Sequence, residues 1–148
     1  MVSASSRSGH LFRPCVVHRS RAGGSATHPA PPSPTGAPVQ KLSLDALARE
    51  QLEAARRAPA GRAARTAVGG HDHVMRQTVI ALCAGRELAE HDNPGEATVQ
   101  VLRGRVRLVA GDTAWEGRQG DLLVVPPRSH RLEAVEDAAV LLTVAKRG

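Results

Sequence analysis

The feature that most constrains this chain is a two-residue alternation of apolar and polar side chains that begins after Gly61. Turn signals such as Asn93-Pro94-Gly95 and Pro126-Pro127 interrupt it at short intervals. A period of two is typical of half-buried strands. Many short strands without intervening helices predict a sandwich or barrel and exclude a β-α-β fold. The predicted strands are Ala63–Val68, Val74–Cys83, Glu87–Glu90, Thr98–Arg103, Arg105–Val109, Thr113–Glu116, Asp121–Val125, His130–Ala134 and Ala138–Ala145.

The clearest alternation covers residues 99–108, and it predicts a hairpin that turns near Arg103-Gly104. Arg105 and Arg107 would point to water, while the apolar residues between them would point inward. The predicted inward residues are Val99, Val101, Val106 and Leu108.

The segment before the strands, residues 41–60, has a helical period instead. Ser43 is a predicted N-cap for a helix that runs to about Ala58, and Pro59 ends it. The apolar positions form one stripe along this helix, so it should pack on a sheet or on a partner. These positions are Leu44, Leu47, Ala48, Leu52 and Ala55. The strands of residues 61–148 then make up the main domain.

Residues 1–40 carry six of the ten prolines, four arginines and no acidic residue. Such a segment cannot bury enough apolar surface to offset its chain entropy, and we predict a disordered basic tail. Because regular structure begins just after Val39, and valine codons serve as bacterial starts, we also expect the natural protein to begin at Val39 read as Met.

Composition excludes several classes of function. The net charge of +6 comes largely from the four tail arginines, and the remaining residues carry 16 basic and 14 acidic side chains. Aromatic platforms for bases are also missing, so we predict no nucleic-acid partner. No apolar run of 18 residues occurs, which predicts no membrane span. Cys15 and Cys83 lie in unrelated contexts and form no disulfide framework, which favours a cytoplasmic protein.

Two stretches resemble the sequence motifs of the cupins. Residues 85–104 (GRELAEHDNPGEATVQVLRG) are similar to the first motif, which is Gly, five residues, His-x-His, three or four residues, Glu, six residues and Gly. Residues 120–130 (GDLLVVPPRSH) are similar to the start of the second. The resemblance covers roughly residues 62–146 and implies an antiparallel cupin-like β-barrel (jelly roll), commonly a homodimer.

The same resemblance implies a ligand set of three histidines and one glutamate around one divalent metal, which is iron, manganese, nickel or zinc. His91 stands at the first ligand position, and Asn93 replaces the second histidine. The glutamate position counted back from Gly104 holds Ala97, while Glu96 is one residue early and would face the other way unless a bulge returns it. His130 also arrives one residue early.

We therefore expect His91, Asn93, Glu96 and His130 to line a ligand pocket, with His91 and His130 as the candidate metal ligands and no catalytic residue assigned. The competing interpretation of the two histidines is a polar pair left in a degenerate metal site. The His71-Asp72-His73 segment could also chelate a metal, but a solvated loop is the simpler interpretation.

Three functions stay open at this point. The leading hypothesis is a small cupin-like protein that binds a small molecule in its barrel and acts as a sensor or accessory protein. The alternative is a metal-dependent oxygenase or isomerase that uses His91 and His130, with Glu96 as a further ligand or base. The last is a structural homodimer whose barrel is filled by its own side chains, with the amphipathic helix at the dimer interface.

Overall fold

The structure is a computed structural model, and it describes residues 36, 38–93 and 95–147. Every helix and strand in this description belongs to one compact unit, Val39–Gly148. The predicted disordered tail of residues 1–40 lies outside the described residues except for residues 36 and 38–40. The tail and the expected start at Val39 therefore stay predictions.

All nine predicted strands are present, and the longest shift of a boundary is at the start of β4, which begins at Gly95 instead of Thr98. The elements are α1 (Leu44–Arg57), β1 (Arg62–Val68), β2 (Met75–Leu82), β3 (Glu87–His91), β4 (Gly95–Arg103), β5 (Arg105–Ala110), β6 (Thr113–Arg118), β7 (Leu122–Val124), β8 (His130–Ala134) and β9 (Ala138–Lys146).

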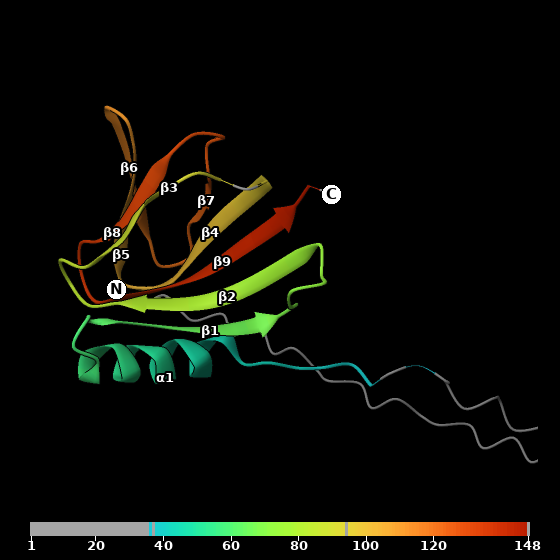
Figure 1. Cartoon of the computed structure of the whole chain (residues 1–148). Helices are drawn as coiled ribbons and strands as arrows, with labels where there is room; N and C mark the ends of the chain where they lie inside the picture. Colours follow the sequence, from blue (N-terminus) through green and yellow to red (C-terminus); the bar gives the residue numbers. More distant parts are fainter. Residues whose placement is uncertain (1–35, 37, 94, 148) are drawn as a thin grey trace, which may run out of the picture. The chain divides into compact units, whose positions relative to one another are not determined.

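The strands form two facing antiparallel sheets (Figure 1). One has the order β1-β2-β9-β4-β7 and the other the order β3-β8-β5-β6. Because neighbours in each sheet are mostly distant in sequence, the chain passes repeatedly from one sheet to the other, which is the arrangement of a jelly roll. The predicted fold class is confirmed, with the described strands paired as two sheets.

The inner faces of the two sheets share one aliphatic core. The predicted inward residues Val99, Val101, Val106 and Leu108 all lie in it and are at most 4% exposed. Arg107 points outward as predicted, and it pairs there with Glu116 at 3.3 Å. Alternation over residues 99–108 therefore identified the buried faces of β4 and β5 correctly.

The predicted hairpin around residues 103–104 is wrong. Strand β4 pairs with β9 and β7, whereas β5 pairs with β6 and β8, so the two arms belong to different sheets. Gly104 makes the corner with φ at 73°, and a Cβ added there would meet the carbonyl oxygen of Asp137 at 2.2 Å. Alternation specifies which face of a strand is buried, but it does not specify the partner strand.

Helix α1 covers the outer face of the five-stranded sheet over β1, β2 and β9 (Figure 1). Ser43 caps it as predicted, and its Oγ accepts from the backbone N–H of Ala46 at 3.2 Å. Ala48 and Leu52 pack on the sheet, and Asp45 bonds Arg103 at 2.6 Å. The apolar stripe is thus covered by its own sheet, which removes the reason for placing the helix at a dimer interface.

One end of the jelly roll, where β2, β4 and β8 end, is closed by polar contacts that are partly exposed to solvent. The Asp137 carboxylate accepts from the Ala84 backbone N–H at 2.9 Å and from Arg56 of α1 at 3.1 Å. These two donors favour the charged carboxylate and lower the pKa of Asp137. A single side chain therefore joins the helix, the β2–β3 turn and the β8–β9 turn.

Helix α1 has 14 residues. No helix in the described part of the chain has the length and apolar character needed to cross a membrane.

Candidate functional site

The opposite end of the jelly roll brings together two histidines that the sequence places 39 positions apart. His91 is the last residue of β3 and His130 the first of β8, and the two are cross-strand partners beside a register shift. Their ring centroids lie 4.7 Å apart with the planes inclined by 57°. His130 is 6% exposed, whereas His91 is open to solvent.

Both imidazoles have the same hydrogen-bond arrangement. The Nδ1 atom of His91 lies 2.9 Å from the carbonyl oxygen of Ala89, and that of His130 lies 2.9 Å from the carbonyl oxygen of Arg128. Because a carbonyl oxygen can only accept, each Nδ1 carries the proton, and each Nε2 of a neutral ring is a lone-pair acceptor. Two acceptors cannot bond each other, so this pair needs a donor or a cation from elsewhere.

A small cavity lies beneath the two rings, between the sheets. Its volume is about 20 Å³, room for about one water molecule. Apart from the histidines, its lining is wholly aliphatic and consists of Ile80, Leu88, Val99, Leu108, Leu132, Val140 and Leu142. The deep interior is therefore filled with the protein's own side chains. The sequence alone did not decide whether this interior is hollow or filled.

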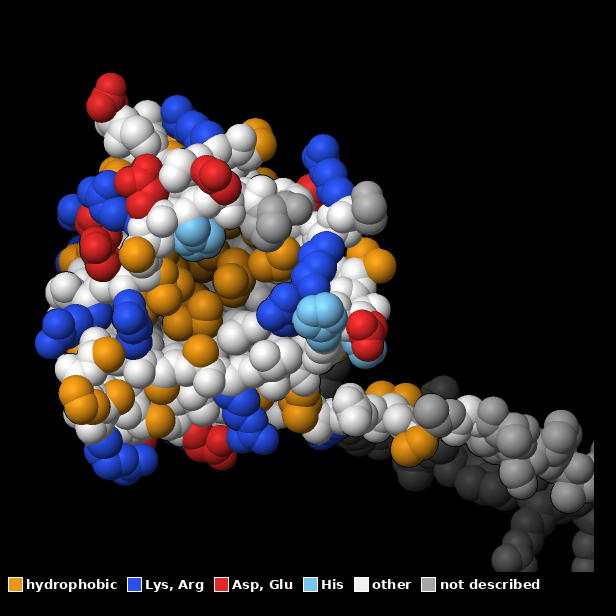
Figure 2. Space-filling view, in the orientation of Figure 1, with side chains coloured by type: hydrophobic (Ala, Val, Ile, Leu, Met, Phe, Trp, Pro, Cys, Tyr) orange, Lys and Arg blue, Asp and Glu red, His pale blue; other side chains and the backbone are white. Residues whose placement is uncertain are grey.

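Above this filled interior the protein surface is hollowed. Figure 2 shows apolar side chains gathered inside the hollow, with a histidine and Lys or Arg side chains at its rim. The arrangement leaves an apolar floor with polar groups around it, which is the usual composition of small-molecule sites.

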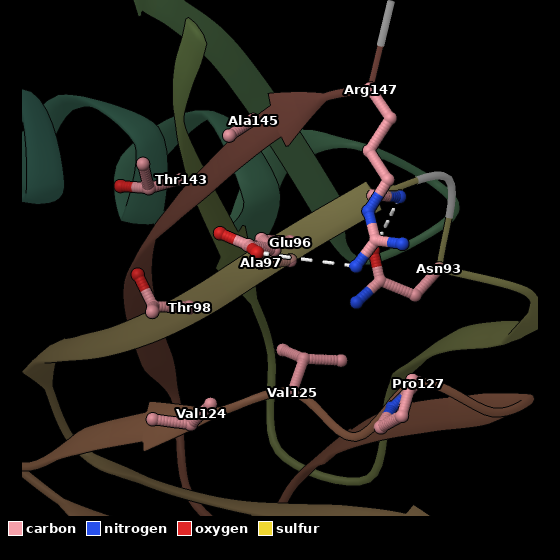
Figure 3. A pocket seen from close by; sticks show the side chains of 11 residues that line it. Asn93, Glu96, Ala97, Thr98, Val124, Val125, Pro127, Thr143, Ala145 and Arg147 are labelled. Atoms are coloured by element: carbon pink, nitrogen blue, oxygen red, sulfur yellow. Dashed lines mark hydrogen bonds and ion pairs between the residues drawn. The ribbon is translucent and has the colours of Figure 1, made fainter.

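Glu96 does not join the histidines. Pairing of β4 with β9 runs without a shift from Gly95 to Val101, so the bulge that would turn Glu96 inward is absent from this stretch. Ala97 faces the core and is 8% exposed, while the Glu96 side chain is 80% exposed and lies 4.0 Å from Arg147 on the outer side (Figure 3). Glu96 therefore lies one residue before the inward position of the motif, and Ala97 occupies that position.

Asn93 also lies apart from the histidines. Its Oδ1 accepts from the Gly95 backbone N–H at 3.2 Å, which holds the turn into β4. Asn93 and Glu96 line a separate groove of about 480 Å³, formed by the ends of β4 and β9 and the segment from β7 to Pro127 (Figure 3). The four predicted pocket residues are thus divided between two places, with the histidine pair in one and Asn93 and Glu96 in the other.

The side chains at this end do not fit the four-ligand metal centre that the resemblance implies. The described residues contain no group of three or more His, Cys, Asp or Glu side chains placed to hold a metal ion. At the positions of the missing ligands stand an apolar residue, Ala97, and an amide, Asn93, that is already bonded. The His71 side chain is 98% exposed and lies 3.4 Å from Asp72, as expected for a solvated loop.

Sequence reasoning missed one charged residue at the same end. Arg76 lies two positions before Thr78 and four before the buried Ile80, so alternation along β2 places it on the inner face. An arginine at an inward position of a strand was the signal that could have revealed it. Its side chain is half-buried.

Fold and site together define a small jelly-roll domain with a polar rim at one end. No protein-family model and no curated protein matches this chain. Solved structures do match. An RmlC-like cupin from Desulfovibrio desulfuricans is 30% identical, with 57% of this chain and 81% of that chain covered and a TM-score of 0.50. The chain belongs to the cupin superfamily, as its motifs predicted.

Two further structures are similar. A conserved protein of unknown function from Streptococcus pyogenes is 32% identical over 59% of this chain and 75% of that chain, with a TM-score of 0.54. A cupin superfamily protein from Desulfitobacterium hafniense DCB-2 is 15% identical over 58% and 78% of the two chains, also with a TM-score of 0.54. At that identity the likeness concerns the fold alone.

Proposed function

We propose that the protein binds a small molecule at the open end of its jelly roll, in a sensor or accessory role. The observation that carries this proposal is the orientation of His91 and His130. Each ring donates its N–H to a backbone carbonyl, which leaves two acceptor nitrogens side by side at the edge of an apolar floor. Polar groups fixed in this way are typical of a site that orients a ligand.

The site also defines what the ligand must contain. Two acceptors require a donor, so the ligand needs a hydroxyl or amine group directed at the rings. The floor below consists of Leu88, Leu132 and Leu142 among other aliphatic residues, and it suits an apolar part. Because the enclosed space holds about one water, most of the ligand must lie in the hollow above (Figure 2).

The metal-enzyme alternative has less support, because the two imidazoles are fewer than the three protein ligands that catalytic metal sites usually supply. The alternative of a purely structural jelly roll explains the filled interior. It does not explain why two imidazoles stand side by side at the rim with their Nδ1 atoms bonded to backbone carbonyls and their Nε2 atoms without a bond to the described residues.

A matched pair of probes tests the proposal with the full chain. 1-Pentanol and butyl methyl ether contain the same atoms, but only the alcohol donates a hydrogen bond. We expect saturation-transfer NMR to show the alcohol binding more tightly, by about fivefold to tenfold for one hydrogen bond. A His91→Ala, His130→Ala variant should lose this preference, and the exposed-loop variant His71→Ala should keep it.

Two results would contradict the proposal. Equal affinity for alcohol and ether, or no binding of either, would support the structural jelly roll. Elemental mass spectrometry supplies the other arm: near-stoichiometric metal in the wild type and none in the double histidine variant would favour the metal-dependent alternative.

A further inference from the structure

Arg76 has a definite place at the open end. Its cross-strand neighbour on β9 is Val144, and the neighbour of Val144 on β4 is Ala97. These three residues form one row across the inner face of the five-stranded sheet. The next row inward contains Leu142 and Val99, which line the cavity beneath the histidines.

The histidines stand on the other sheet at the same end. Strand β3 ends at His91, and β4 begins four residues later at Gly95. The row of Arg76 crosses β4 at Ala97, two residues after this start, so this row and the histidine pair both border the opening. Facing sheets pack about 10 Å apart. A long side chain from one sheet and a small ligand can together fill such a gap. Figure 2 shows this arrangement of types, with Lys or Arg and His side chains around the hollow.

Arg76 has no charge partner in this position. No ion pair and no side-chain hydrogen bond joins it to another residue in the described part of the chain. By comparison, Arg105 and Arg107 on the outer face of the other sheet are paired with Glu116. The guanidinium cannot lose its proton, and a half-buried charge is costly unless it is paired.

The histidines restrict where an anion can lie. In the neutral rings, the Nε2 atoms are lone-pair acceptors, so they disfavour carboxylate oxygens and favour hydroxyl or ammonium groups. The Arg76 side has the opposite preference, because a guanidinium only donates and matches the planar carboxylate. One guanidinium also balances one negative charge, which suits a monocarboxylate better than a doubly charged phosphate.

We propose that the ligand of the open end is a small hydroxycarboxylic acid, with its carboxylate on Arg76 and its hydroxyl directed at His91 and His130. This inference rests on the proposed function, because it names the ligand class of the same site. It assigns opposite ends of the ligand to the two sheets, so Arg76 becomes the residue that selects for an acid.

Four five-carbon probes separate the contributions in the full chain: 5-hydroxypentanoate, pentanoate, 1,5-pentanediol and 5-amino-1-pentanol. We expect 5-hydroxypentanoate to bind most tightly and to exceed the diol by about tenfold to a hundredfold, the range for a charge-assisted bond. The amino alcohol should have the lowest affinity of the four, because its ammonium group carries the same charge as the Arg76 guanidinium. Affinities come from NMR titration of the protein.

Variants assign the effect to Arg76. Arg76→Gln should reduce the preference for the acid over the diol to about onefold to threefold. Arg76→Lys retains the charge without the planar fork and should keep part of the preference, which guards against a Gln variant that fails to fold. Arg118→Gln is the matched control, because Arg118 lies at an outward position of β6 opposite Arg105 and has no ion pair among the described residues.

The possible results are distinct. Equal binding of acid and diol by the wild type would overturn this inference and leave the proposed function standing. A preference that survives in Arg76→Gln would overturn the role of Arg76. Failure of all four probes, together with failure of 1-pentanol, would overturn the proposed function itself.

Discussion

The two ends of this jelly roll differ in how completely their polar groups are hydrogen-bonded within the protein. At the closed end, backbone groups bond across the turns, as between Gly85 and Ala134 at 2.8 Å, and Asp137 has two donors. At the open end, backbone carbonyls bind the Nδ1 atoms of His91 and His130, whereas their Nε2 atoms and the Arg76 guanidinium have no partner among the described residues. Saturated polar groups stabilise a fold, and unsaturated ones are available to a ligand.

This comparison predicts that stability depends on the closed end and the core, whereas binding depends on the open end. The largest expected effect is a truncation in the core. Leu82 is 1% exposed near the closed end, and Leu82→Ala should lower the free energy of unfolding by about 3–4 kcal/mol through lost burial and a cavity. Urea denaturation measures it.

Leu122→Ala is the control for this prediction. Leu122 is 60% exposed on β7, so its truncation should cost about 0.5 kcal/mol or less. Similar losses for the two leucines would contradict the core assignment.

The corner between β4 and β5 should give the next largest effect. Gly104→Ala adds a Cβ that meets Asp137 O at 2.2 Å in a left-handed backbone conformation, and we expect a loss of about 2–3 kcal/mol. Gly85→Ala shares the positive φ, at 79°, but its Cβ meets nothing within 4 Å. That control should cost about 1 kcal/mol. Equal losses at the two glycines would show that the close approach to Asp137 is unimportant.

Asp137 should make the closed end sensitive to acid. Its pKa is lowered in the folded state, so its stabilising contribution is present above the unfolded value near 3.9 and disappears as the pH falls through the folded value. Compared with Asp137→Asn, the wild type should be more stable at pH 7, by about 1 kcal/mol or less because the pair with Arg56 is partly exposed.

This advantage should vanish in urea denaturation near pH 2. Glu136→Gln, which changes the neighbouring carboxylate, is the control. A wild-type advantage over Asp137→Asn that stays constant from pH 7 to pH 2 would contradict the role of the charged carboxylate.

The smallest effect on stability is expected at the rim. The His91 side chain is exposed and its hydrogen bond is to Ala89 of the same strand, so His91→Ala should change the free energy of unfolding by about 0.5 kcal/mol or less. Thermal denaturation of this variant beside His130→Ala checks it, since the buried His130 should cost more. A larger loss for His91 would mean that the open end also stabilises the fold.

Most of the fold could be predicted from the sequence. Alternation located all nine strands, and the stripe that begins at Leu44 located the helix. These signals are local, because they record which side of a segment is buried. The hairpin at Gly104 failed because pairing between strands is a long-range property, and a glycine there is compatible with a hairpin turn or with a corner between sheets.

The candidate site was predicted only in part. Counting along the motif already distinguished Ala97 from Glu96, and the structure places these two side chains on opposite faces. Counting could not show that Asn93 holds a turn, nor that Arg76 borders the same opening. Those facts depend on which strands are neighbours across the sheet.

The sequence by itself determined the strands, the capped helix, the buried faces of β4 and β5, and membership of the cupin superfamily, because each depends on spacing along the chain. Only the tertiary structure decided that the deep interior is filled and that the two histidines meet at the rim. It also decided that their Nε2 atoms and Arg76 have no partner among the described residues. The physical reason is that close packing and hydrogen-bond partners are set by residues distant in sequence, which no local pattern records.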